Sequence, residues 1–160
     1  DYIMDTSHML VRELKQEIDK IFLENEEYQN FFITILSFGF KYGIPADCDL
    51  VFDVRFLPNP YYIPELKKKT GNDFEVYDYV MKSEQAKEFD EKLFDMIKFL
   101  VPNYITEGKN QLVIGIGCTG GKHRSVSLAN ALAKHMQELP YSLKVEHRDI
   151  EKDAKTKGEN

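Results

Sequence analysis

The chain has 160 residues, and its 27 acidic side chains outnumber its 21 basic ones, which gives a net charge of −6. Hydrophobic residues make up 42% of it, including 11 Phe and 9 Tyr, so it can bury one sizeable core and is not disordered as a whole. The length fits one soluble domain. The acidic balance excludes a globally basic nucleic-acid-binding protein, so any phosphate site must come from a local cluster of basic groups.

The cysteines, the histidines and the hydropathy argue against disulfide-rich, metal-binding and membrane proteins. Two cysteines, Cys48 and Cys118, are too few for a disulfide framework and too far apart for a metal knuckle, which favours a reducing compartment. The spacing of His8, His135 and His147 matches no metal-ligand motif, so we expect no metal site. Because no apolar run approaches the roughly 20 residues that span a bilayer, we expect a cytoplasmic protein without membrane contact.

The first elements in chain order are an extended start, a helix and a strand. Residues 1–6 resemble the end of a strand that enters a helix cap, so we expect them to be the remnant of an upstream domain. An amphipathic helix is predicted over Ser7–Asn25, with its apolar residues on one stripe. The run Asn30–Phe40 mixes β-branched and aromatic residues, which predicts a buried strand.

A second strand and a proline-rich loop follow. The strand is predicted over Asp49–Arg55, and three prolines between residues 58 and 64 then impose an extended loop. Asp53 and Arg55 therefore lie at a strand end, and Asn59 lies in the loop. The two charged residues form either part of a ligand site or an exposed ion pair, and the strand-end position favours the ligand site.

The second half of the chain alternates strands and helices. A long amphipathic helix is predicted over Ser83–Tyr104, weakened or ended by Pro102. A strand over 111–118, a helix over 127–139 and a strand over 142–148 complete the pattern. This order predicts an α/β fold, with a largely parallel sheet flanked by helices on both faces, in a single compact domain over 7–150. Residues 151–160 form a polar tail.

The segment Gly115–Ser127 is the most informative part of the sequence. Glycines, hydroxyls and basic side chains converge there where a buried strand turns into a helix. Loop amides, the helix N-terminus and the basic groups would together bind an anion. The predicted phosphate ligands are Thr119, Gly120, Gly121, Lys122, His123, Arg124 and Ser125. The pKa of His123 is expected to be low between two cations, so that its charge is optional.

Three known phosphate-binding patterns can be compared with this loop. A Walker loop fails, because Ile116 stands where its first glycine belongs. The dinucleotide pattern G-x-G-x-x-G matches, but too little chain follows to complete a doubly wound domain. Cys118, Arg124 and Ser125 reproduce the C-x5-R-[ST] spacing of cysteine phosphatases, in which a thiolate attacks phosphorus. For Cys118 the alternative is a small packing residue.

The phosphatase interpretation lacks two parts of the usual pattern. The residue before the cysteine is Gly117, where that class usually has histidine. Its general acid would have to come from Asp47, Asp49 or Asp53, and no motif selects among them.

Two long strings, FGFKYGIPADCDLVFDVRFLPNP and IGIGCTGGKHRSVSLANALA, and the later HRDIEK, closely resemble the C-terminal half of the RapZ (YvcJ) family of bacterial nucleotide-binding regulatory proteins. The resemblance covers nearly the whole chain. It implies an upstream P-loop NTPase domain that binds ATP or GTP, and a C-terminal domain that binds glucosamine-6-phosphate. In some members it implies a small RNA as well. The protein would be regulatory, without covalent chemistry in this domain, and a homo-oligomer.

The resemblance also implies a ligand pocket, which falls on Asp53, Arg55, Asn59 and the loop from Cys118 to Ser125. Two departures stand out. Tyr61 replaces a histidine that some members carry. The last twenty residues hold five Lys or Arg and five Asp or Glu, whereas RNA-binding members end in a basic tail. RNA binding is therefore expected to be weakened here.

Overall fold

The structure is a computed structural model, and it describes residues 30–152. The elements run in the order β1 (Phe32–Gly39), the 3-10 turn η1 (Phe40–Tyr42), β2 (Leu50–Asp53), the 3-10 turn η2 (Pro60–Tyr62), α2 (Phe74–Met81), α3 (Glu84–Glu107), β3 (Gln111–Cys118), α4 (Arg124–Met136) and β4 (Ser142–His147). The predicted helix over Ser7–Asn25 and most of the polar tail lie outside the described residues.

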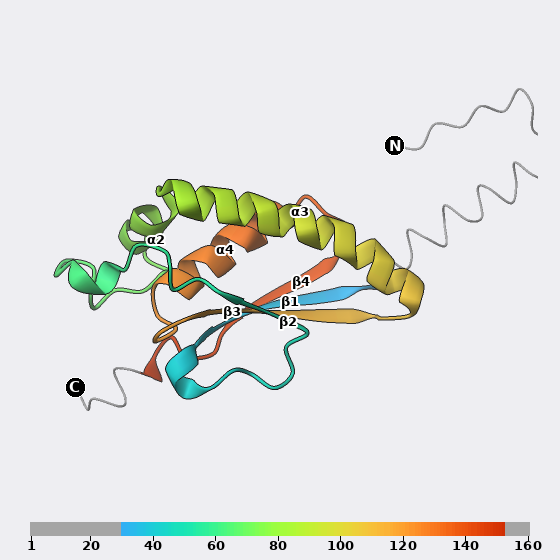
Figure 1. The fold of residues 1–160 in the computed structure, drawn as a ribbon, viewed down its shortest axis with the longest axis horizontal. Coiled ribbons are helices and arrows are strands. Elements are labelled where there is room, and N and C mark those ends of the chain that lie inside the picture. The colour runs from blue at the N-terminus through green and yellow to red at the C-terminus, as the bar shows by residue number, and fades with distance from the viewer. Residues whose placement is uncertain (1–29, 153–160) are drawn as a thin grey trace, which may run out of the picture.

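The four strands form one parallel sheet in the order β2-β3-β1-β4, which confirms the predicted α/β class (Figure 1). Strands β1 and β3 pair in full, from Phe32 opposite Gln111 to Gly39 opposite Cys118. Helix α4 connects β3 to β4 and crosses over β1. Because all four strands are parallel, their carboxyl ends meet at one edge of the sheet, where α/β proteins bind ligands.

The core lies between the sheet and the helices. Alternate residues of β1, such as Ile33 and Ile35, point to this face and are fully buried, as are Leu112 and Ile114 of β3. Each such side chain contributes about 1.5–3 kcal/mol to stability when buried. Figure 1 shows the three described helices above the same face of the sheet, whereas helices on both faces were expected.

Two features of the helices go beyond the sequence prediction. Helix α2 was not predicted; it is short, and only Val76 and Val80 are buried on it, which leaves a weak apolar stripe. Helix α3 continues past Pro102 to Glu107 and ends at Gly108, whose φ is 102°. The threonine hydroxyl at position 106 donates to the carbonyl of Pro102, so the turn stays closed around the proline.

The other boundaries moved by a few residues. Strand β2 ends at Asp53, two residues earlier than predicted, and Arg55 lies in the following turn. Helix α4 begins at Arg124, three residues earlier than predicted. No helix within residues 30–152 is long and apolar enough to cross a membrane.

Candidate functional site

The Gly-rich loop, residues 119–123, connects β3 to α4 and lies at the carboxyl ends of the strands. Strand β2 pairs with β3 up to Asp53 opposite Gly117, and the Val54 amide donates to the Gly117 carbonyl at 2.9 Å. The turn after β2 is therefore beside the loop. The register of β2 and β3 therefore brings segment 53–59 next to the loop after Cys118, and the sequence had predicted ligand contacts in both.

The backbone of the loop passes very close to the end of β1. A Cβ atom on Gly39 would lie 2.4 Å from the carbonyl carbon of Gly120, a distance that side-chain carbons do not adopt. Gly121 has a φ of 74°, in the left-handed region that favours glycine. Glycine is therefore required at both positions, because the loop folds back onto the end of β1.

Helix α4 starts without a side-chain cap. Its N-cap residue, His123, has a helical backbone and makes no capping hydrogen bond. Within residues 30–152 the amides of Gly120, Gly121 and Lys122 donate to no backbone carbonyl. The loop therefore combines amides that have no backbone acceptor with the positive end of a 13-residue helix. This combination binds phosphates and carboxylates in other proteins.

Arg124, the first residue of α4, is buried, with 7% of its surface exposed. Its Nη1 donates to the carbonyl of Arg55 at 2.6 Å, and Nη2 contacts the Thr119 hydroxyl at 3.4 Å. Although it begins the helix, Arg124 is covered by the turn after β2, whose carbonyls at Arg55 and Leu57 accept from Nη1. Within residues 30–152 Arg124 forms no ion pair with Asp53, which pairs with Arg55 instead.

The two residues before Arg124 contact the segment between η2 and α2. The Nζ of Lys122 and the Nε2 of His123 both lie near the carbonyl of Lys67, at 3.3 and 3.1 Å. A carbonyl only accepts, so Nε2 carries a proton. Burial, followed by the charge of Lys122, lowers the pKa of His123, which keeps the ring neutral at pH 7. The low pKa was expected, although burial and not charge is its main cause.

Cys118 ends β3 directly under the loop. The residue is 3% exposed, and its thiol donates to the Ser125 hydroxyl at 3.1 Å. The predicted C-x5-R-S pattern therefore does form one cluster in space. The thiol is nevertheless buried.

The two strand-end charges pair with each other. Arg55 Nη2 lies 2.6 Å from Asp53 Oδ2, and both side chains are about half exposed. Hydrogen bonds from Arg55 lower the pKa of Asp53. The guanidinium also stacks over Phe40, 4.2 Å from the ring centre. Asn59 accepts from the Tyr61 amide and so caps η2.

Asp49 and Asp53 lie at opposite ends of β2. Asp49 pairs with Lys109 at 2.9 Å and accepts from the Val113 amide, far along β3 from Cys118. Of these two candidates for a phosphatase acid, only Asp53 lies at the edge that carries the loop.

Asp149 is a site residue that sequence reasoning missed. Its carboxylate is fully buried and accepts from the Gly39 amide at 2.8 Å, from Arg148 and from Lys152 at 2.7 Å. Its Cβ lies next to Gly121. It therefore ties the end of β1 to the back of the loop. The string HRDIEK was the available signal, but nothing in it indicates a contact with Gly39, 110 residues away.

No cluster of three or more His, Cys, Asp or Glu side chains within residues 30–152 is placed to hold a metal ion. His147, for example, is occupied by protein groups. Its Nδ1 accepts from the Ser37 hydroxyl at 2.7 Å, and its Nε2 donates to the Asn130 side-chain oxygen at 3.1 Å.

The amino-acid sequence matches a known protein family. The family model described as the RapZ C-terminal domain matches residues 31–151. The chain is 68% identical over 152 residues to a nucleotide-binding protein of Lachnoclostridium phytofermentans, with 95% of this chain and 53% of that protein covered. It is 69% identical over 155 residues to a nucleotide-binding protein of Agathobacter rectalis, with 96% and 53% covered. The chain thus spans about half the length of these relatives.

Proposed function

Because the chain belongs to the RapZ C-terminal domain family, we propose that it is a regulatory domain that binds a phosphorylated amino sugar of the glucosamine-6-phosphate type. One observation carries this proposal: the uncapped N-terminus of α4 faces a loop whose amides, from Gly120 to Lys122, have no backbone acceptor within residues 30–152. A phosphate would accept these hydrogen bonds and offset the helix dipole.

The turn after β2 supplies groups for the sugar. Asp53 is half exposed beside the loop, and its lowered pKa keeps it ionised at neutral pH. A ligand ammonium can share its carboxylate with Arg55. Asn59 and Thr119 offer neutral donors and acceptors for hydroxyls. In this arrangement the loop binds the phosphate and Asp53 selects for the amine.

Titration calorimetry with related ligands tests the proposal. Glucosamine-6-phosphate should bind more tightly than glucose-6-phosphate, which lacks the amine, and glucosamine without phosphate should bind more weakly than either. Asp53→Asn should remove most of the preference for the amine, while the exposed control Asp95→Asn on α3 should leave it unchanged. Equal affinity for glucosamine with and without phosphate would overturn the assignment of the loop.

A cysteine phosphatase is the second candidate, because the Cys118 thiol and the Ser125 hydroxyl are in contact at 3.1 Å. A serine in that place would assist the leaving thiolate. The buried thiol and the carbonyl partners of Arg124 favour binding over catalysis. We expect no turnover of p-nitrophenyl phosphate that depends on Cys118; hydrolysis lost in Cys118→Ser would make the phosphatase the better assignment.

The activity and partners of a longer protein are further proposals. The relatives are named nucleotide-binding proteins, which agrees with ATP or GTP binding in an upstream P-loop domain. Homo-oligomers and a cytoplasmic location are proposed on the resemblance. Small-RNA binding has the least support among these proposals, because the basic and acidic side chains of the last twenty residues cancel. Measuring RNA affinity at several salt concentrations tests this proposal. A steep fall of affinity with rising salt would support contacts to RNA phosphates, and an affinity that does not depend on salt would exclude them.

A further inference from the structure

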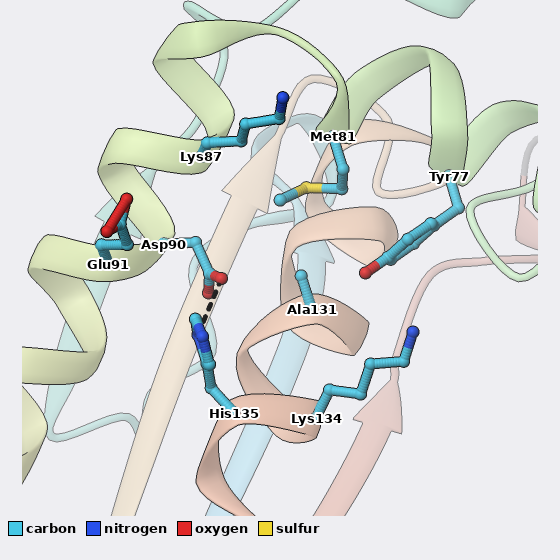
Figure 2. A pocket seen from close by; sticks show the side chains of 8 residues that line it. All are labelled: Tyr77, Met81, Lys87, Asp90, Glu91, Ala131, Lys134 and His135. Carbon is cyan, nitrogen blue, oxygen red and sulfur yellow. Dashed lines mark ion pairs between the residues drawn. The ribbon is translucent and has the colours of Figure 1, made fainter.

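Two features of the molecule lie away from the Gly-rich loop: a pocket and an open sheet edge. The pocket, of about 550 Å³, opens between α2, α3 and α4 (Figure 2). Its two lysines, Lys87 and Lys134, are balanced by Asp90 and Glu91, and Asp90 pairs with His135 at 2.9 Å. The pocket by itself therefore defines no ligand, whereas the outer edge of β4 defines a partner.

Strand β4 forms one edge of the sheet, and β1 is its only strand neighbour within residues 30–152 (Figure 1). The amides of Ser142 and of Arg148, just past the end of β4, donate to carbonyls of the β1 segment at 3.1 and 3.0 Å. Backbone groups of successive residues alternate in direction along a strand, so residues 144 and 146 also face β1. The amides and carbonyls of Leu143, Val145 and His147 therefore point away from the sheet.

The side chains of β4 carry opposite charges two residues apart. Lys144 and Glu146 lie on one face of the strand, with 68% and 46% of their side chains exposed, and they pair with each other at 2.8 Å. Leu143 and Val145 lie on the other face and pack against the core, but they stay only half-buried. Charges protect an edge strand when they repel a second copy of it, and a lysine beside a glutamate does not.

We propose that β4 pairs in antiparallel orientation with β4 of a second copy of this chain, about a two-fold axis at Val145. The two four-stranded sheets then form one continuous sheet. Val145 lies opposite Val145, and Leu143 lies opposite His147, in hydrogen-bonded pairs made by the outward amides and carbonyls. Lys144 lies opposite Glu146 of the second copy in the non-hydrogen-bonded pairs, where side chains approach most closely.

Hydrogen bonding and charge select the same register. A slip by one residue would place outward backbone groups opposite groups that already bond β1. A slip by two residues would place Lys144 opposite Lys144, or Glu146 opposite Glu146, and like charges directly opposite each other destabilise a strand pair. The register centred on Val145 avoids both costs.

Analytical ultracentrifugation of the full chain tests the association. One strand pair buries less surface than the roughly 1,200–2,000 Å² of stable interfaces, so we expect a weak dimer with a dissociation constant of about 10–100 µM. Hydrogen exchange of the Leu143, Val145 and His147 amides should become several-fold slower between about 1 and 500 µM protein. Monomers at about 500 µM, or exchange that does not depend on concentration, would overturn the proposal.

Charge variants test the register. Lys144→Glu and Glu146→Lys each place two like-charge pairs in the interface, so each should weaken dimer formation about tenfold or more. A mixture of the two variants restores opposite charges at both positions and should form mixed dimers about as tightly as the wild type. Lys92→Glu and Glu88→Lys make the same charge changes in an exposed pair on α3 and should leave the dimer unchanged.

This inference names a surface for the homo-oligomer proposed above, and the experiments separate the two. A dimer that persists in Lys144→Glu, or variants that do not associate when mixed, would overturn the β4 interface and assign the oligomer to another surface. Lys144→Glu should also bind glucosamine-6-phosphate as the wild type does, because Lys144 is not part of the Gly-rich loop or of the turn after β2. Failure of sugar-phosphate binding would leave the interface untouched.

Discussion

The two ends of α4 differ in how completely their polar groups are satisfied. At the N-terminal end, Arg124 and Ser125 contact neighbouring segments, and Asp149 braces the loop from behind. At the C-terminal end, Asp90 and His135 lie close together but leave buried polar atoms unused. Packed and hydrogen-bonded side chains thus hold backbone amides that have no backbone acceptor at one end, whereas buried side-chain atoms lack a partner at the other. We therefore expect substitutions at the first end to reduce stability and sugar-phosphate binding together, and substitutions at the second end to change stability without changing sugar-phosphate binding.

The largest effect is expected from Asp149→Asn. The amide cannot accept from Gly39, Arg148 and Lys152 at once, and it leaves the two cations without their counter-charge. Breaking a buried ion pair costs about 3–5 kcal/mol, so the variant should lose much of its unfolding free energy in urea. Glu75→Gln, which breaks the exposed pair with Lys69, should change the unfolding free energy far less, because water screens that pair. Similar losses in the two variants would show that Asp149 does not brace the loop.

Gly39→Ala should have the next largest effect. The new methyl would clash with backbone atoms of Gly120 and Gly121, which have no flexible side chain to give way. Overpacking of this kind costs about 1–3 kcal/mol, and sugar-phosphate affinity should fall with it because the loop moves. Gly108→Ala is the contrasting control: Gly39 has an ordinary extended φ of −105°, whereas Gly108 has a φ of 102° but no atom within 4 Å of a new methyl, so only a conformational cost of about 1 kcal/mol is expected there. A weak effect at Gly39 would mean that the loop is more adaptable than the contacts indicate.

Arg124→Lys should affect ligand binding more than stability. Lysine keeps the charge and can reach one carbonyl, but it loses the planar fork that contacts both Arg55 and Thr119. We expect a 10- to 100-fold loss of sugar-phosphate affinity, which corresponds to the loss of about one hydrogen bond to a charged group. The melting temperature should fall only slightly. Lowered melting with unchanged affinity would make Arg124 purely structural.

The smallest effect concerns pH. Burial lowers the pKa of His123 and of His147, so each takes up a proton more readily in the unfolded chain than in the folded one. Their contribution to stability is present above the unfolded value of about 6.5 and is lost as the pH falls below it. Urea unfolding between pH 7 and pH 5 should show this decline, and His147→Gln should reduce its slope. If the dependence of unfolding free energy on pH is the same in His147→Gln as in the wild type, His147 does not contribute to it.

The sequence predicted the sheet well because its strands carry strong local signals. The apolar run of β3 and the glycines after it define a buried strand and a turn without any knowledge of the rest of the chain. The burial of Arg124 could not be predicted, because its partner on Nη1 is a backbone carbonyl and carbonyls occur at every residue. The role of Asp149 depends on a contact across 110 residues. Helix α2 was missed because two buried valines give too little periodicity.

The most direct test of the central claim is a nuclear magnetic resonance titration of the ¹⁵N-labelled chain with glucosamine-6-phosphate. If the Gly-rich loop binds the phosphate, the amide signals of Gly120, Gly121 and Lys122 should shift most and together, and the signals of Asp90 and His135 should stay in place. Inorganic phosphate should move the same three amides to a smaller extent. Saturable binding that leaves these amides unshifted would contradict the account.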